Sequence, residues 1–237
     1  MSILTITFDD GYKDTYSNTA EHLINRGVKA TFAIPSDHIS GILENRPVMD
    51  KNDILYLQSN GHEIAAHTGS HVNLLSLFNT GGKQAVLDQL SSPKVVFQNS
   101  LGITPVSFVF PFIERNNNAE LRGLASEHYR SSRITSDTFS VNPLPVNDPF
   151  SITGTAITTS TDLPTLNGYI DSILDKNVWL IEVFHLVSAK NTKSAHRDAP
   201  YGFFTHIDIF MAHLDHIQNS GITLLTQKDA IASFTAR

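Results

Sequence analysis

Two short segments carry side chains whose types and spacing suit hydrolytic chemistry. Asp9 and Asp10 follow the apolar run over residues 3–8, and His67 and His71 follow a second short apolar run. Imidazoles and carboxylates are common ligands of a divalent ion such as zinc. One carboxylate would complete a three-ligand site with the two histidines, and the other would be left to accept a proton.

Each motif also has an ordinary structural explanation. Asp-Gly after a strand is a common turn sequence, and two histidines four residues apart also occur as a capping and a surface residue. The positions of these residues favour a catalytic role over a structural one, because α/β proteins build their active sites at the carboxyl ends of strands. His185 ends a third apolar run over residues 178–184, and for it a buried structural role and a proton-donating role are both open. Within that run, Glu182 needs a partner if it is buried, and the sequence does not identify one.

Composition narrows the class of protein. Hydrophobic residues make up 41% of the 237 residues, which suffices for a sizeable core, and one domain over residues 1–237 is the simplest organisation. The formal charge of -6 without a dense basic block argues against nucleic acid as a partner. No stretch approaches the ~20 apolar residues of a transmembrane segment. No secretory signal is visible, which leaves the compartment open between the cytoplasm and an exported protein without its signal. Because the chain has no cysteine, any metal must be held by His, Asp or Glu.

The elements that would position these groups alternate between strand and helix, which predicts an α/β fold with a mostly parallel sheet. The expected strands are residues 3–8, 30–35, 63–67, 106–110, 129–133, 178–185 and 222–225. The expected helices are residues 15–26, a helix between Asp50 and Gly61, residues 83–100, residues 164–176, and one opening near Thr205. The apolar stripe of the last helix predicts that His213 and His216 lie on its solvated side. Residues 142–162 are rich in Pro, Thr, Ser and Asn, and we expect irregular loop with short extended pieces there.

Three segments in a fixed order resemble the motifs of one enzyme family. They are Thr-Phe-Asp-Asp-Gly at residues 7–11, Gly-His-Glu-Ile at 61–64 and His-Thr-Gly-Ser-His at 67–71. The chain thus resembles the polysaccharide deacetylases with NodB homology, carbohydrate esterase family 4. Residues 107–112 resemble the third motif of that family and residues 179–185 its fifth, so that the resemblance runs from residue 3 to about residue 225. It implies a distorted (β/α) barrel, usually with seven parallel strands.

The resemblance also implies an activity and a metal. Members of the family remove acetyl groups from N- or O-acetylated sugars with a divalent ion, so the implied partner is an acetylated glycan. At the matching positions, Asp10, His67 and His71 would bind the ion. Zinc is the first candidate, with cobalt, nickel or manganese as alternatives. The oligomeric state is not indicated.

Further roles follow from the same matching positions. Asp9 would be the general base and His185 the general acid. Pro111 and Phe112 would line the substrate groove, and the backbone around Phe112 would help to hold the developing oxyanion.

The sequence departs from the familiar pattern in the third motif. Many members have Arg where this chain has Val109, and Gly where it has Ile113. The missing Arg normally tethers the catalytic carboxylate. Arg133 is a candidate substitute for orienting Asp9, with a surface arginine as the alternative. Two other functions also stay open, namely a related amide hydrolase of a small cyclic or formylated molecule and a weakly active carbohydrate-binding relative.

Overall fold

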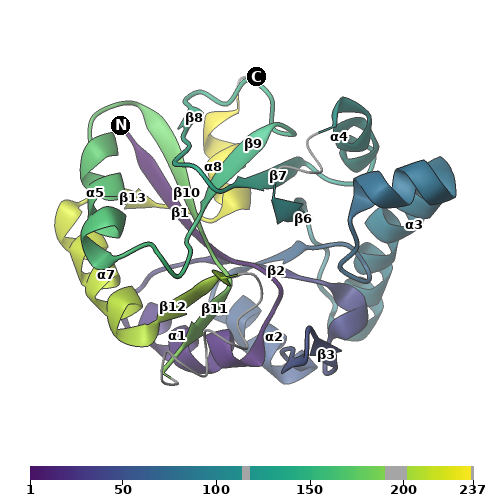
Figure 1. The fold of residues 1–237 in the computed structure, drawn as a ribbon, viewed down its shortest axis with the longest axis horizontal. Coiled ribbons are helices and arrows are strands. Elements are labelled where there is room, and N and C mark those ends of the chain that lie inside the picture. Colours follow the sequence, from purple (N-terminus) through teal and green to yellow (C-terminus); the bar gives the residue numbers. More distant parts are fainter. Residues whose placement is uncertain (114–117, 190–201, 236–237) are drawn as a thin grey trace.

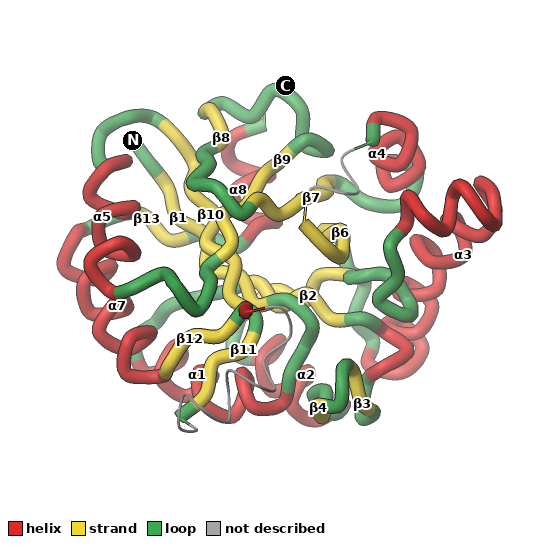
Figure 2. The backbone as a smooth tube through the Cα atoms, in the orientation of Figure 1, coloured by secondary structure: helices red, strands yellow, loops and turns green. Residues whose placement is uncertain are grey.

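The computed structural model describes residues 1–113, 118–189 and 202–235. Seven parallel strands form a closed ring, in which each strand pairs with the next and the last pairs back onto the first (Figures 1 and 2). In ring order they are β1 (Ile3–Phe8), β2 (Thr31–Ile34), β5 (Glu63–Ala66), β6 (Ser107–Ile113), β7 (Ser131–Ser136), β9 (Ile152–Ala156) and β10 (Val178–Phe184). The expected α/β barrel with about seven parallel strands is therefore confirmed.

The ring is distorted where β1 meets β2. These two strands pair only at Thr7↔Thr31 and Phe8↔Phe32. The start of β1 pairs instead with β13 (Thr223–Leu224), which lies outside the ring. A register shift in β6 adds a second irregularity between Val109 and Ile113.

Two strand predictions are corrected by this topology. The expected strand over residues 222–225 contributes only the two residues of β13 and is not part of the barrel. The seventh barrel strand is β9, which lies within the stretch expected to be mainly irregular. It joins the ring by pairing with β7 on one side and with β10 on the other.

Helices surround the ring (Figure 1). They are α1 (Lys13–Asn25), α2 (Lys51–Ser59), α3 (Leu74–Leu101), α4 (Ala119–Ser126), α5 (Leu163–Ile173), α7 (Ile207–Ser220) and α8 (Gln227–Phe234). Asp50 caps α2 through a capping box with Asp53, in line with the expected start of that helix. α3 begins earlier than expected, and the backbone at Gly82 is non-helical within it.

Short elements complete the described chain. They are the 3-10 helix η1 (Ser36–His38), the hairpin β3 (Ile42–Leu43) and β4 (Arg46–Pro47), and the strands β8 (Asn142–Pro143), β11 (Leu186–Ser188) and β12 (Phe204–His206). Among the described residues, no helix combines the length and the apolar character that crossing a bilayer requires.

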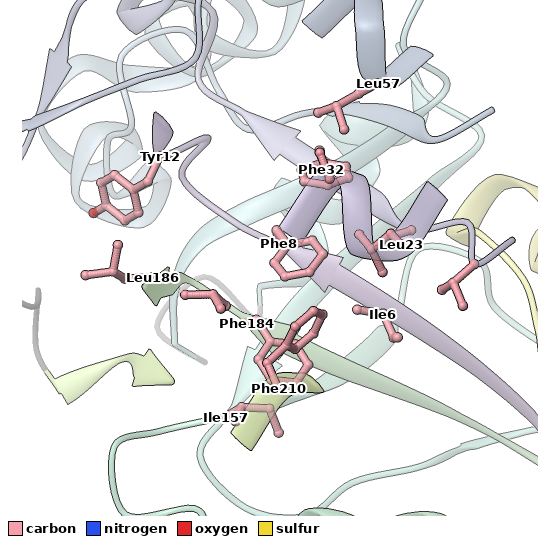
Figure 3. Packing of buried hydrophobic residues seen from close by; sticks show 14 of the residues in the cluster. Ile6, Phe8, Tyr12, Leu23, Phe32, Leu57, Ile157, Phe184, Leu186 and Phe210 are labelled. Atoms are coloured by element: carbon pink, nitrogen blue, oxygen red, sulfur yellow. The ribbon is translucent and has the colours of Figure 1, made fainter. Parts of the chain in front are cut away.

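The main hydrophobic core lies between the barrel wall and the helices (Figure 3). Phe8 of β1 packs on Phe32 of β2 and on Phe210 of α7, with ring centroids 4.9 and 5.6 Å apart. Because side chains alternate along a strand, Thr5 and Thr7 of β1 then face the interior of the barrel. Trp179 Nε1 donates to the Thr5 hydroxyl there, at 2.9 Å. The same alternation directs Asp9 inward.

A buried polar group joins β10 to α5 and α7. Glu182 Oε2 lies 3.0 Å from His213 Nε2, and His213 Nδ1 lies 2.9 Å from Asn167 Oδ1. The prediction that His213 lies on the solvated side is wrong, because α5 packs against that face of α7 and His213 is fully buried. His216 is partly exposed and lies 2.8 Å from Asp171. His213 is thus the partner that the sequence could not identify for Glu182.

A second polar network lies at the amino end of the barrel, where the strands begin. Glu63 Oε2 accepts hydrogen bonds from the Thr31 hydroxyl and from the backbone N–H of Lys228, both at 2.9 Å. Gln227, also in the first turn of α8, donates through its backbone N–H to Thr31 and through Nε2 to Ser131. This network attaches α8 to the first residues of three barrel strands.

Candidate active site

Three of the predicted residues meet at the carboxyl end of the barrel. Asp10 follows β1, and His67 and His71 follow β5. Asp10 Oδ1 lies 3.3 Å from His67 Nε2 and 3.1 Å from His71 Nε2, and one ligand atom from each residue lies within 4.8 Å of the others. Two imidazole nitrogens and one carboxylate oxygen, held this closely, fit the donor set of a catalytic zinc-type site that keeps a position open for substrate.

The His67 ring is oriented by the backbone of β6. Its Nδ1 lies 2.8 Å from the carbonyl oxygen of Val109. A carbonyl can only accept, so Nδ1 carries a proton, and Nε2, on the side of Asp10, is the nitrogen that could bind an ion. Metal-binding histidines commonly have such a partner on the far nitrogen.

The charges of the trio shift the pKa values of its members. Burial alone would raise the pKa of Asp10, but the neighbouring His71 and His67 hold it well below its usual value. Burial alone would lower the pKa of His71, but Asp10, with smaller contributions from Glu44 and Asp9, raises it. Three carboxylates thus act on the imidazole of His71, and Arg133 is paired with one of them, Asp9.

The backbone around this site is unusual. Asp10, Thr68, His71 and Phe112 have left-handed φ values of 72°, 61°, 54° and 66°. Such values are uncommon for residues other than glycine, especially for a β-branched residue such as Thr68. Each carries a strain of about 1–3 kcal/mol that the surrounding structure must offset, and such residues cluster at functional sites.

Asp9 lies beside the trio and is tied to Arg133 inside the barrel. Arg133 Nη2 donates to Asp9 Oδ1 at 2.6 Å, and both side chains are buried. The Thr7 hydroxyl donates to the same oxygen at 3.3 Å. The alternative that Arg133 is a surface arginine is therefore wrong.

Strand register explains how Arg133 reaches this place. Arg133 of β7 is the direct partner of Val109 on β6, the position at which many family members carry Arg. Gly154 on β9 has no room for a side chain, since a Cβ there would lie 2.5 Å from Val183 Cγ2 and 3.2 Å from Arg133 Cδ. The guanidinium thus enters the barrel from the neighbouring strand.

The remaining predicted residues lie at the same end of the barrel. His185 directly follows β10, which pairs with β1, and its charge acts on Asp10. Its ring packs against Phe203 at 4.6 Å, and within the described part of the chain its Nδ1 has no hydrogen-bond partner. Pro111 is buried in β6, whereas Phe112 is 37% exposed with its ring 5.1 Å from that of His71. The side chain of Ile113 lies outside the described residues.

Sequence reasoning missed Tyr12 and Glu44. The Tyr12 hydroxyl donates to Glu44 Oε2 at 3.0 Å, which connects the Asp-Asp-Gly turn to the tip of the β3–β4 hairpin. Burial, together with the charges of Asp10 and Glu44, raises the pKa of Tyr12. The only available signal was the place of Tyr12 directly after the motif.

Comparison with known proteins agrees with this geometry. A family model described as polysaccharide deacetylase matches residues 2–129, more than half of the chain. A chitin deacetylase from Pestalotiopsis sp. is 29% identical over 111 residues, which is 47% of this chain and 34% of that protein. The chain therefore matches about a third of the length of that curated relative.

Solved structures share the fold at low sequence identity. A family 4 acetyl xylan esterase from Clostridium thermocellum, in complex with a cobalt ion, superposes with a TM-score of 0.63 at 15% identity, over 98% of this chain and 91% of that one. A family 4 pseudoenzyme from Bacillus anthracis superposes with a TM-score of 0.60 at 12% identity, over 97% and 65%. These two likenesses concern the fold alone. With the family model covering both the Asp-Asp-Gly and the His-Thr-Gly-Ser-His segments, the chain belongs to the polysaccharide deacetylase family.

Proposed function

We propose that this protein is a metal-dependent hydrolase that removes acetyl groups from an N- or O-acetylated carbohydrate. The observation that carries the proposal is the compact trio of Asp10, His67 and His71 beside a carboxylate, Asp9, that a buried arginine holds in place. Family membership supports the same reaction class.

The trio would hold the ion through one carboxylate oxygen and the two Nε2 atoms. When bound, a divalent ion polarises an acetyl carbonyl and lowers the pKa of water toward ~7. Zinc fits this donor set, and cobalt, nickel and manganese are the alternatives.

Asp9 is the proposed general base. Among the described residues, both hydrogen bonds to its side chain go to Oδ1, from Arg133 and Thr7. This arrangement fixes the carboxylate plane and leaves Oδ2 to take the proton from the attacking water. We assign Arg133 the role of orienting Asp9, in place of the arginine that many family members carry at position 109.

His185 is the proposed general acid. It follows the strand that pairs with β1, so its ring lies at the same barrel end as Asp9, and the packing against Phe203 restricts its rotation. Donation of a proton to the departing amine or sugar oxygen by such a group contributes typically about 10²–10⁴-fold to the rate. Pro111 and Phe112 are the proposed groove residues, with the exposed Phe112 ring available to a sugar face.

Acetate release tests the proposal. Acetylated chito-oligosaccharides and acetylated xylan serve as substrates, with and without a chelator, and elemental analysis identifies the metal. We expect acetate release that stops with chelator, and loss of both metal and activity in His71→Ala. Release that is indifferent to chelator, or full metal content in His71→Ala, would contradict the assignment.

The same assay separates the alternatives. Metal-dependent turnover of a small formylated or cyclic amide, without acetate release from glycans, would favour the related amide hydrolase. Tight glycan binding without turnover would favour the weakly active binding relative.

A further inference from the structure

The loop over residues 67–71 depends on contacts with other elements to keep its conformation. Residues 67–71 carry two of the three proposed ligands, and two residues of this short loop, Thr68 and His71, have left-handed backbone. Residues keep such a strained backbone conformation only where the surrounding structure holds them in it. Contacts with neighbouring elements must therefore hold this loop.

One side of the loop is held by backbone hydrogen bonds. In η1, the Ser36 N–H donates to the Thr68 carbonyl at 3.2 Å and the Asp37 N–H donates to the Gly69 carbonyl at 2.9 Å. Gly69 fits closely against its neighbours, because a Cβ there would lie 2.7 Å from the Ser92 hydroxyl and 2.9 Å from Asp37 Oδ2. The first half of the loop is thus defined by η1 and α3.

The second half is held by one side chain of α3. Gln89 Oε1 accepts hydrogen bonds from the Ser70 N–H at 2.9 Å and from the Ser70 hydroxyl at 3.2 Å. Ser70 directly precedes His71, whose Nε2 lies 3.1 Å from Asp10. Gln89 is half-buried and lies on the stretch of α3 that follows Gly82.

We propose that Gln89 is a positioning residue for the metal centre, which fixes Ser70 and thereby holds His71 against Asp10. This inference rests on the proposed metal site. Metal-binding groups must be held within about 0.5 Å of the productive geometry by their supporting contacts. Without its acceptor, the Ser70 N–H loses this bond and the strained backbone at His71 loses its nearest support on that side.

Cobalt binding to the metal-free protein is the direct test, because it requires no turnover. Gln89→Met keeps the length of the side chain and removes the acceptor. We expect about tenfold weaker cobalt binding, at the lower end of the range for lost outer contacts of metal ligands. Gln84→Met is the matched control on the same helix, since Gln84 is exposed and bonds Asp88; it should bind cobalt as the wild type does. Gln89→Glu keeps an acceptor oxygen and should bind no more weakly than wild type.

The outcomes separate the two proposals. If the wild type binds cobalt, His71→Ala does not, and Gln89→Met binds as tightly as wild type, the role of Gln89 is overturned while the metal site stands. If the wild type binds no cobalt, or His71→Ala binds it equally well, the proposed function fails. Should Gln89→Met not fold, as judged by thermal unfolding, Ser70→Ala removes one of the two bonds and should weaken cobalt binding about threefold; unchanged binding there would overturn the inference.

Discussion

Glu63 and Asp10 are buried carboxylates at opposite ends of one barrel, and their pKa values move in opposite directions. Burial raises the pKa of Glu63, and its hydrogen bonds with hydroxyl and backbone groups do not reverse the shift. Burial acts on Asp10 in the same sense, but His71 and His67 reverse it. The comparison shows that burial alone raises the pKa of a carboxyl group, and that neighbouring imidazoles reverse this shift.

The two ends differ in backbone as well. Glu63 lies within a regular strand, and its network attaches a helix to the barrel. Asp10 has a left-handed backbone and follows the strand end. Changes at the carboxyl end should therefore alter catalysis, and changes at the amino end should alter stability.

The largest expected effect is that of Asp9→Asn. This change keeps the shape of the side chain and removes the proposed base, so kcat should fall about 10²–10⁴-fold. Cobalt affinity should stay within about threefold of wild type, because Asp10 and the two histidines remain. Equal kcat for wild type and variant would remove Asp9 from the base role.

Arg133→Met should have the second-largest effect, because it leaves the Asp9 carboxylate buried and unpaired. Removing one partner of such a pair destabilises a fold by about 3–5 kcal/mol, and we expect lower kcat with the chain still folded. Denaturant unfolding and acetate release measure the two effects.

A second arginine variant sharpens this test. Val109 lies beside Ala33 and Ala65 in the barrel interior and is the ladder partner of Arg133. Val109→Arg combined with Arg133→Met should recover part of the lost kcat. Wild-type kcat in Arg133→Met alone would show that Asp9 needs no tether.

At the amino end, Glu63→Gln should leave kcat/KM within about twofold of wild type. Because the pKa of Glu63 is raised in the folded protein, the folded state binds more protons than the unfolded state above pH 4.5. The free energy of unfolding of the wild type should therefore fall as pH rises from 4.5 toward the raised pKa of Glu63, by at most about 1.4 kcal/mol per pH unit. The variant should lack this slope in urea unfolding; an identical slope would exclude Glu63 as its origin.

His62 should give the smallest effect, with the opposite sign. Burial and the charge of Lys29 lower its pKa from 6.5 to about 4, and its Nδ1 accepts from the Ala30 N–H at 3.1 Å. The unfolded state therefore binds more protons between these values, and stability falls as pH decreases. Between pH 7.5 and 5.5 the wild type should lose about 1.3 kcal/mol through this group. His62→Asn keeps a hydrogen-bond acceptor and should lose less stability over this pH range. An equal loss in the variant would show that the pH dependence comes from another group.

The mostly parallel sheet and the grouping of Asp10, His67 and His71 were predictable from local signals, whereas closure into a seven-stranded barrel was implied by the family resemblance. Apolar runs ended by Asp10 and His67 mark strand ends that must face the same way in a parallel sheet. β9 could not be found in this manner. Its sequence, Ile-Thr-Gly-Thr-Ala, has a glycine at its centre and little apolar character, and it is a strand because β7 and β10 both need a partner there.

Contacts between elements that are distant in the sequence could not be predicted either. The apolar stripe of α7 placed His213 outside, because the pattern of one helix does not show that α5 covers its flank. The link between Gln89 and Ser70 depends on how α3 lies against the loop after β5. Such pairings follow from tertiary packing rather than from spacing along the chain.

The ladder pairing of Val109 with Arg133 has a consequence for sorting related sequences into active and inactive members. A column-by-column alignment would score this chain as lacking the arginine of the third motif, although Arg133 on the adjoining strand donates to Asp9. Searches for inactive members should therefore compare residues that lie close in space on neighbouring strands, not only residues in the same alignment column. They should also ask whether a glycine on the next strand leaves room for the arginine side chain.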